Sequence, residues 1–246
     1  MPRFSRTRLL IGEEAFARLH SSHVAVIGLG AVGGYALEGL ARAGIGRFTL
    51  VDFDLIKPTN INRQIFALES TLETLKTEAA LQRIVDINPA CRAEGLNLFI
   101  DQDTVATVLE RQPDVIIDAI DALNPKVQLL RAAHASTIPT FSSMGAALRT
   151  DPLKIRVDDL SRTDHCPLAK RIRKRLRRDG ITSGITCVYS TESVHFDFSR
   201  TGPDEPSEQV IERGRERNTL GSLPTITAIF GLTLANEVIQ LLSKEL

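Results

Sequence analysis

The segment from residue 23 to about residue 42 constrains the fold more than any other part of the chain. A compact apolar run, Val24-Ala25-Val26-Ile27, leads directly into Gly28-Leu29-Gly30-Ala31-Val32-Gly33 and then into a helical pattern. An unbroken apolar run of this length is typical of a strand buried in a parallel sheet. The three glycines permit a tight turn and let a phosphate approach the backbone N–H groups of the helix that follows. The sequence therefore predicts a nucleotide-binding turn between a strand and a helix.

Strand and helix patterns alternate to about residue 145, which predicts an α/β fold with a doubly wound, mostly parallel Rossmann-like sheet. Beyond residue 150 we expect two short strands, a basic helix at 168–178, a loop at 199–222 rich in Gly, Pro, Ser and charge, and an apolar helix at 223–242. We expect residues 1–150 to form the nucleotide-binding part. Residues 151–246 would form a smaller, irregular C-terminal part that completes the same globular unit.

The charge and cysteine content exclude several classes of protein. Thirty basic residues balance thirty acidic ones, so no global field draws the chain to nucleic acid, and such a role must rest on a local patch. The three cysteines form no C-x-x-C pair, so we expect no zinc site and no disulfide framework, which suits a reducing cytoplasm. The apolar stretch 223–242 contains Asn236 and Glu237, which are costly in a bilayer, so we expect a buried helix and no stable membrane insertion.

Residues after the second predicted strand indicate which nucleotide is bound. Asp52 follows that strand, 19 residues after Gly33, a spacing that suits a carboxylate accepting ribose hydroxyl groups. The glycine fingerprint with such a carboxylate most often means NAD or FAD. Here it is followed by Asp54, Asn60, Arg63, Gln64 and Lys76. Two cations and an amide this close in sequence suit a triphosphate attacked at its α-phosphate, although a solvated loop and helix face remain the alternative.

A further pair of carboxylates, Asp118 and Asp121, follows the strand predicted at 115–117. Ligands of such sheets bind at the carboxyl ends of the strands, so Asp121 is a candidate for the Mg²⁺ that accompanies ATP. Two other interpretations stay open. Asp118 could accept hydrogen bonds from the backbone of its own turn, and Asp121 could cap the helix that follows.

In this combination the chain resembles the ubiquitin-activating-enzyme-like superfamily, which includes bacterial adenylyltransferases of sulfur-carrier proteins. The motifs that carry the resemblance are Arg3-Phe4-Ser5-Arg6, Gly28-x-Gly30-x-x-Gly33, Asp52-x-Asp54, Asn60-x-x-Arg63-Gln64, Lys76 and Asp118-x-x-Asp121. The resemblance implies that ATP is used, that Asp52 binds its ribose, that Asn60, Arg63 and Lys76 bind its phosphates, and that Asp121 holds magnesium. It also implies a homodimer, in which Arg6 reaches the ATP of the neighbouring subunit.

The second half contains, in this order, Asp158-Asp159-Leu160, Pro167-Leu168-Ala169, Val188-Tyr189-Ser190-Thr191-Glu192 and Gly221-Ser222-Leu223-Pro224. This order is similar to that of the tRNA threonylcarbamoyladenosine dehydratases of this superfamily. The second half lacks the two C-x-x-C pairs usual in sulfur-carrier adenylyltransferases, and it departs from the dehydratase pattern at Cys166, where an acidic residue is expected. The resemblance implies a tRNA substrate whose threonine carboxylate is adenylated and then cyclised. Two alternatives remain: adenylation of the C-terminal glycine of a ubiquitin-like sulfur carrier, and a non-catalytic nucleotide-binding module in a sulfur relay. Sulfur-handling relatives also suggest a cysteine desulfurase or sulfur acceptor as a partner.

The predicted helix at 168–178 is the one strongly basic segment of this neutral chain. Six of the eight residues from 171 to 178 are cationic: Arg171, Arg173, Lys174, Arg175, Arg177 and Arg178. Leu168, Ile172 and Leu176 share one face by their four-residue spacing, so we expect the cations to face solvent and to contact tRNA phosphates. A solvated helix face without a ligand is the alternative.

Overall fold

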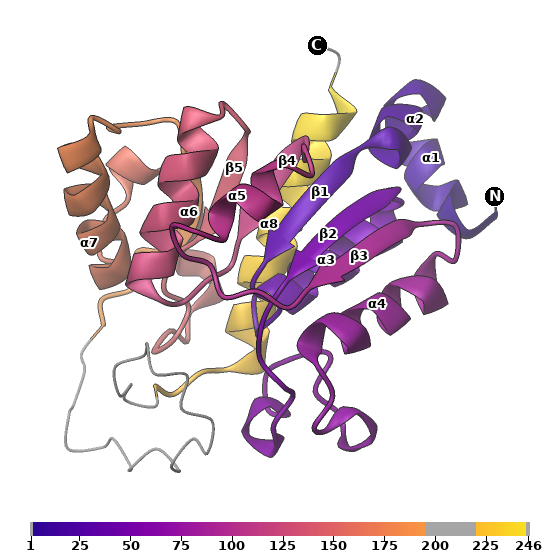
Figure 1. Cartoon of the computed structure of the whole chain (residues 1–246), viewed down its shortest axis with the longest axis horizontal. Helices are drawn as coiled ribbons and strands as arrows, with labels where there is room; N and C mark the ends of the chain where they lie inside the picture. Colours follow the sequence, from indigo (N-terminus) through magenta and orange to yellow (C-terminus); the bar gives the residue numbers. More distant parts are fainter. Residues whose placement is uncertain (1, 195–219, 245–246) are drawn as a thin grey trace.

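The computed structural model describes residues 2–194 and 220–244, in which a seven-stranded sheet lies between two layers of helices (Figure 1). The strands are β1 (His23–Ile27), β2 (Arg47–Val51), β3 (Arg92–Leu96), β4 (Val115–Asp118), β5 (Thr140–Ser143), β6 (Ile155–Asp159) and β7 (Thr186–Ser190). The helices are α1 (Ser5–Ile11), α2 (Glu13–Ser21), α3 (Gly33–Ala43), α4 (Lys76–Ile87), α5 (Val105–Leu109), α6 (Leu123–Ala135), α7 (Pro167–Leu176) and α8 (Pro224–Ser243). Residues 199–219 of the predicted loop at 199–222 lie outside the described residues.

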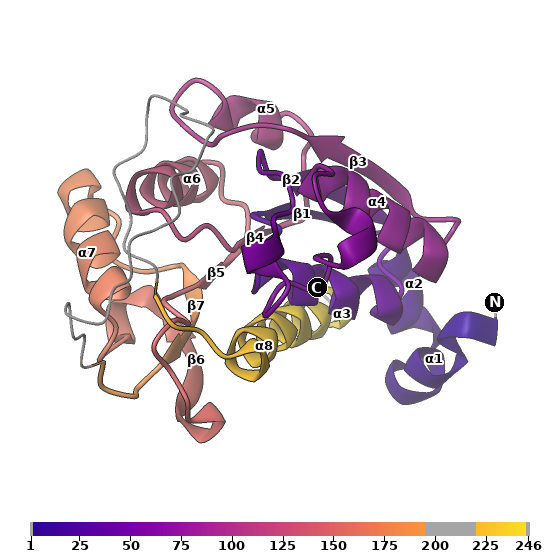
Figure 2. The ribbon, with the colours of Figure 1, turned by 90° about the horizontal axis from the view of Figure 1, so that it is seen from below.

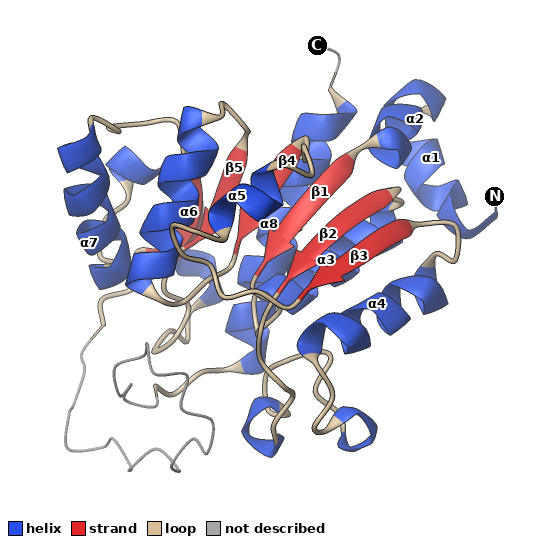
Figure 3. Cartoon of the chain, viewed as in Figure 1, coloured by secondary structure: helices blue, strands red, loops and turns tan. Residues whose placement is uncertain are grey.

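The strands follow the order β3-β2-β1-β4-β5-β7-β6, and every neighbouring pair is parallel except β6 with β7. Figure 3 shows the part of this order from β3 to β5. The chain runs outward from β1 to β3 and then returns to place β4 on the other side of β1. The strand order therefore reverses between β1 and β4, and in open parallel sheets ligands bind in the crevice at such a point. The predicted doubly wound, mostly parallel sheet is confirmed.

Side chains that alternate along the strands bury the two faces of the sheet under different helices. Val24 and Val26 of β1 pack in one cluster with residues of α3, α4 and α8, whereas Ala25 and Ile27 pack in another with residues of α5 and α6. The view along the sheet shows these two layers, with α3 and α8 on one side and α5 and α6 on the other (Figure 2). β1 is buried along its whole length because it has a strand on each side and helices on both faces.

The residues after 150 extend this sheet with β7 and the antiparallel edge strand β6. Ile172 and Leu176 of α7 pack with Cys187 and Tyr189 of β7 in a third apolar cluster. The four-residue spacing that predicted the apolar face of α7 is therefore confirmed. Since strands from both parts share one sheet, the division at residue 150 stays a prediction, and the two parts form one hydrogen-bonded layer.

α8 is the one helix of the described residues that is long and apolar enough to cross a membrane by length and composition, with a mean hydropathy of 1.5. In the structure it packs along α3 and buries Ile226, Phe230, Leu234 and Val238, which recur every four residues. The contact is close because small residues meet. A Cβ added to Gly231 would lie 2.3 Å from the carbonyl oxygen of Val32, in the turn that begins α3.

We predict that Gly231→Ala lowers the free energy of unfolding by about 2 kcal/mol. An added methyl group must displace the backbone of residue 32, and overpacking of this kind costs about 1–3 kcal/mol, more than the roughly 1 kcal/mol that alanine contributes over glycine within a helix. Denaturant titration followed by circular dichroism measures the change. Gly221→Ala is the control, since a Cβ there meets nothing within 4 Å and stability should not fall. An unchanged unfolding midpoint for Gly231→Ala would contradict the close packing.

Candidate nucleotide site at the carboxyl ends of the strands

The three central strands end level with one another. Ile27, the last residue of β1, is paired with Val51 of β2 on one side and with Asp118 of β4 on the other. The segments that follow these three residues therefore lie side by side at one edge of the sheet. They are the glycine loop at 28–33, the acidic turn at 52–54 and the loop at 119–121, and they include most of the predicted site.

The three glycines of the loop differ in what a side chain at each position would contact. Gly28 has a φ of +91°, and a Cβ there would lie 2.9 Å from the carbonyl oxygen of Ala119. A Cβ on Gly33 would lie 1.8 Å from the carbonyl oxygen of Gly28. At Gly30, by contrast, the nearest atom would be Nε2 of Gln64 at 3.9 Å. The fold requires Gly28 and Gly33, whereas Gly30 leaves open space near the N-terminus of α3, where a phosphate is predicted to bind.

Asp52 ties the acidic turn to the glycine loop. One of its carboxylate oxygens accepts a hydrogen bond from the backbone N–H of Leu29 at 2.7 Å, and the other accepts one from the N–H of Asp54 at 2.9 Å. Burial raises the pKa of the Asp52 carboxyl group, and the nearby Lys76 ammonium opposes that rise. Asp52 thus fixes the shape of the loop, and its contact with ribose stays a prediction.

Lys76, the first residue of α4, reaches into the same place. Its Nζ lies 2.6 Å from Oδ2 of Asp54 and 3.7 Å from Oδ1 of Asp52, and its side chain is buried. Its backbone N–H also donates to the carbonyl oxygen of Asp54. The alternative of a solvated helix face does not apply to Lys76, because its ammonium is held between two carboxylates beside the glycine loop.

The loop from 57 to 64 carries the other predicted phosphate contacts. Gln64 is buried beside Gly30. The Arg63 guanidinium is partly exposed and donates to the carbonyl oxygen of Thr59 and to Oδ1 of Asn62, while Oδ1 of Asn60 accepts from the N–H of Lys57. Asn60 and Arg63 therefore brace their own loop in this structure, and their contacts with phosphate stay a prediction.

The loop after β4 is held by residues that the sequence did not reveal. Oδ1 of Asp118 accepts a hydrogen bond from the N–H of Ile120, as the turn interpretation proposed. Oδ2 of the same carboxylate lies 2.8 Å from Nζ of Lys126, and both side chains are fully buried. Asp121 is exposed, and Ala122 is the residue that directly precedes α6, so Asp121 is not itself the N-cap residue of this helix. Lys126 was missed because a single lysine in a helix gives no periodic signal.

Arg6 lies away from the site of its own chain. Arg3, in the same N-terminal segment, donates to the carbonyl oxygen of Ile87, the last residue of α4. Lys76 is the first residue of that helix, and twelve helical residues span about 18 Å. Arg6 is exposed on α1 at the far end, and its contact with the nucleotide of a neighbouring subunit stays a prediction.

α7 presents fewer free cations than predicted. The Arg173 guanidinium donates to backbone oxygens of Leu160 and Thr163 and to the Thr163 hydroxyl group, and the Arg175 guanidinium contacts Oδ1 of Asn124. The expectation that all six cations face solvent is therefore wrong for these two, because the helix lies against neighbouring segments that supply acceptors. The exposed cations are Arg171, Lys174, Arg177 and Arg178.

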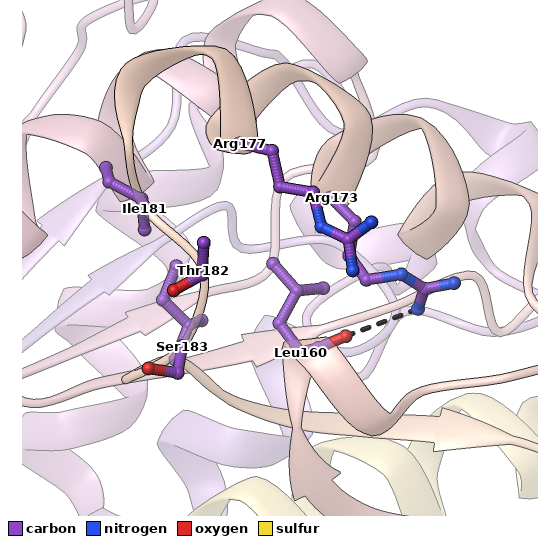
Figure 4. Close-up of a pocket in the computed structure, with 7 residues that line it drawn as sticks. Leu160, Arg173, Arg177, Ile181, Thr182 and Ser183 are labelled. Atoms are coloured by element: carbon purple, nitrogen blue, oxygen red, sulfur yellow. Dashed lines mark hydrogen bonds between the residues drawn. The ribbon is translucent and has the colours of Figure 1, made fainter.

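Two hollows adjoin this helix and lie apart from the glycine loop. Figure 4 shows the first, a shallow depression among Leu160, Arg173, Arg177 and the segment 181–185, with Arg173 bonded to the carbonyl oxygen of Leu160. The second lies between α6 and α7 and is lined by Arg131, Arg175 and Arg178, among others. Both contain arginine, and both belong to the surface on which a tRNA contact was predicted.

The chain belongs to the ThiF family, whose model matches residues 4–245. It is similar to the tRNA threonylcarbamoyladenosine dehydratase of Bacillus subtilis, with 37% identity over 99% of this chain and 95% of the relative. Its structure is similar to that of the Escherichia coli tRNA N6-threonylcarbamoyladenosine dehydratase in complex with ATP, with a TM-score of 0.86 and 34% identity over 98% of this chain and 93% of the other. The molybdopterin-synthase adenylyltransferase of Haemophilus influenzae is 32% identical, over 54% of each chain.

We predict that Gly30→Ala and Gly33→Ala both weaken ATP binding but differ in stability. A methyl group at residue 30 has room in the protein and occupies only the space left for phosphate, so the unfolding midpoint should stay unchanged. A methyl group at residue 33 meets the backbone of Gly28, so that variant should also be less stable. Calorimetric titration with ATP and thermal unfolding measure the two properties. Wild-type ATP affinity in Gly30→Ala would refute the assignment of this space to phosphate.

Proposed function

We propose that this protein catalyses the ATP-dependent cyclisation, a net dehydration, of N6-threonylcarbamoyladenosine in tRNA through an adenylated carboxylate. The observation that carries this proposal is the candidate nucleotide site at the carboxyl ends of the strands, where Asp52 and Lys76 lie beside the glycine loop. The similarity to dehydratases over nearly the whole chain supports the substrate. The adenylyltransferase resemblance extends over about half of the chain, so adenylation of a sulfur-carrier protein fits less well.

The reaction divides into two displacements. A carboxylate oxygen of the threonine moiety attacks the α-phosphorus of ATP, and the bond to the departing pyrophosphate breaks. The oxygen of the neighbouring urea group then attacks the activated carboxyl carbon, a five-membered ring closes and AMP leaves with the former carboxylate oxygen. Because this second nucleophile belongs to the substrate, proximity replaces a protein nucleophile.

The residues of the site match the demands of the first displacement. Negative charge grows on the phosphate oxygens as the α-phosphorus is attacked, and positioned cations stabilise it. Lys76 is already held at the site by two carboxylates, and Arg63 and Asn60 lie on the loop that leads from them. Asp54 and Gln64 complete the surroundings, while Asp52 and the N–H groups of the glycine loop would hold ribose and phosphate.

Mg²⁺ fits this site as a companion of ATP. The described residues contain no group of three or more His, Cys, Asp or Glu side chains able to hold a metal by themselves. Mg²⁺ needs only one or two carboxylates when phosphates and water complete its shell, and Asp121 supplies one at the correct edge of the sheet. When bound, the ion would neutralise phosphate charge.

The exposed cations of α7 and of the 3-10 turn after it support the tRNA contact. Arg171 and Lys174 lie on α7, and Arg177 and Arg178 lie on the turn that follows. Because the protein has zero formal net charge, these residues form a local attraction for the phosphate backbone. Few aromatic residues accompany them, so this helix would contact phosphates and not stack on bases.

A sulfur relay gains no support from Cys91 or Cys187. Burial raises the pKa of Cys91 to about 11, and burial raises the pKa of Cys187 as well. A thiol must ionise to accept or transfer sulfur, so both groups are poor candidates for a relay with a desulfurase or sulfur acceptor. All three cysteines are free, which suits a cytoplasmic location.

We infer a homodimer, and the exposed position of Arg6 on α1 supports it. Next to it on α1, Leu9 and Leu10 are 86% and 85% exposed, an apolar surface that a second copy of the chain would cover. A dimer built on this helix would also bring the distant Arg6 to the partner's nucleotide.

The direct test is mass spectrometry of tRNA nucleosides after incubation with the protein and ATP. N6-threonylcarbamoyladenosine should lose the mass of one water, and AMP should form in equal amount. The proposal fails if the nucleoside is unchanged while a small carrier protein ending in Gly-Gly becomes adenylated. Absence of ATP–pyrophosphate exchange with either substrate would instead favour a non-catalytic module.

We predict that Lys76→Ala and Arg63→Ala each lower the rate of AMP formation by at least a hundredfold, because each removes a cation from the developing phosphate charge, and every tenfold corresponds to about 1.4 kcal/mol. Single-turnover assays with modified tRNA measure the loss. Lys57→Ala is the matched control, as an exposed cation on the same loop that should leave the rate unchanged. Wild-type turnover in either test variant would remove that residue from the mechanism.

We predict that mixing inactive Arg6→Ala and Lys76→Ala proteins restores activity. In a mixed dimer one site combines an intact Arg6 from one chain with an intact Lys76 from the other, so random exchange should yield about a quarter of the wild-type activity. Subunits are exchanged under mild denaturant and then assayed for AMP formation. If Arg6 served its own chain, the mixture would stay inactive.

A further inference from the structure

A second buried ion pair lies beside the candidate nucleotide site and has no part in the reaction described above. Nζ of Lys126, in α6, lies 2.8 Å from Oδ2 of Asp118, at the end of β4, and neither side chain is exposed to solvent. Removing two charges from water is costly, and replacing such a pair with apolar residues is often neutral or stabilising. Stability alone is therefore a weak reason for its presence.

The two residues of the pair form hydrogen bonds with both backbone polar groups of Ile120. Its N–H donates to Oδ1 of Asp118 at 3.1 Å, and its carbonyl oxygen accepts from Nζ of Lys126 at 2.9 Å. The hydroxyl group of Ser142, on the neighbouring strand β5, donates to Oδ2 of Asp118 at 2.7 Å and fixes the carboxylate. A displacement of Ile120 would leave buried polar groups without partners, so this residue is held firmly.

Ile120 separates the two residues through which this loop meets the nucleotide site. Ala119 precedes it, and its carbonyl oxygen would lie 2.9 Å from a Cβ on Gly28, while its N–H donates to the carbonyl oxygen of Ile27. Asp121 follows it and is the expected magnesium ligand. The position of Ile120 therefore sets where Asp121 lies relative to the glycine loop.

We propose that Lys126 is a positioning residue for ATP: its buried ammonium, acting with Asp118 through the backbone of Ile120, holds Asp121 and the glycine loop in the relative geometry that binds the triphosphate with Mg²⁺. The inference rests on the ATP step of the proposed function and not on its tRNA substrate. Lys126 touches neither nucleotide nor metal in this assignment, and it acts only through the loop.

The test uses the double variant Asp118→Asn/Lys126→Met, which removes both charges together at similar volume and so avoids an unpaired buried charge. Calorimetric titration measures its affinity for ATP with Mg²⁺ and with EDTA, and hydrogen exchange measures amide protection at residues 119–122. We expect a folded protein whose amides in this segment exchange at least tenfold faster. Its affinity for ATP with Mg²⁺ should fall at least tenfold, and its affinity in EDTA should fall less.

The control is Glu38→Gln/Arg83→Met, which removes a partly exposed charge pair between α3 and α4 with distances of 2.9 Å between nitrogen and oxygen. Glu38 also accepts a hydrogen bond from Arg42 on its own helix. This control should leave the affinity for ATP and the amide exchange of residues 119–122 unchanged. Wild-type exchange and wild-type affinity in Asp118→Asn/Lys126→Met would overturn the proposal and leave the pair a merely structural one.

Should the double variant not fold, the wild-type protein decides the question by itself. The amide of Ile120 should then be as protected as those of β1, and rapid exchange typical of a surface loop would overturn the proposal. Since no measurement includes tRNA, a failure of cyclisation would refute the proposed function without touching this inference.

Discussion

The contact between Gly28 and Ala119 is the constraint on which the rest of this structure depends. It joins the turn after β1 to the loop after β4, on the two sides of the point where the strand order reverses. Only a glycine fits there, since a Cβ would press on the Ala119 carbonyl oxygen and the backbone has a positive φ. Since β1, β2 and β4 end level with one another, the N-terminus of α3 and the acidic turn at 52–54 lie at the same side of the sheet as these two loops. A nucleotide site thus arises from sheet topology before any side chain contributes.

Two ammonium–carboxylate groups then fix this space from opposite sides. Lys76 with Asp52 and Asp54 lies on the β2 side of the glycine loop, and Lys126 with Asp118 lies on the β4 side. They differ in exposure and in purpose. The first keeps part of Asp54 in contact with solvent, so its lysine can exchange partners when phosphate arrives. The second is sealed from water and tied to backbone, so it resists movement. A preorganised site needs both a cation that can change its partners and a surrounding loop structure that stays fixed.

The sequence predicted the parts of the fold that depend on local pattern. The alternation of strands and helices, the glycine turn and the apolar face of α7 were all readable, since each is set by residues within a few positions. Boundaries set by distant partners were not. α4 begins only at Lys76, because Ile56 pairs with Thr74 and Leu55 bridges to Leu75 just before it. In the site, Asp52 and Lys76 were found by motif, whereas Lys126 and the acceptors that occupy Arg173 required three dimensions.

The packing of Gly231 against Val32 links the beginning of the chain to its end. α8 supports the turn at the start of α3, although the two lie about 190 residues apart in the sequence. Translation proceeds from the N-terminus, so the phosphate-binding turn leaves the ribosome long before the helix that packs on it. A nascent chain would thus carry an unfinished nucleotide site throughout most of its synthesis, and a product cut short before residue 224 would lack that support permanently. The use of ATP therefore depends on α8 having been synthesised and packed against the turn at the start of α3.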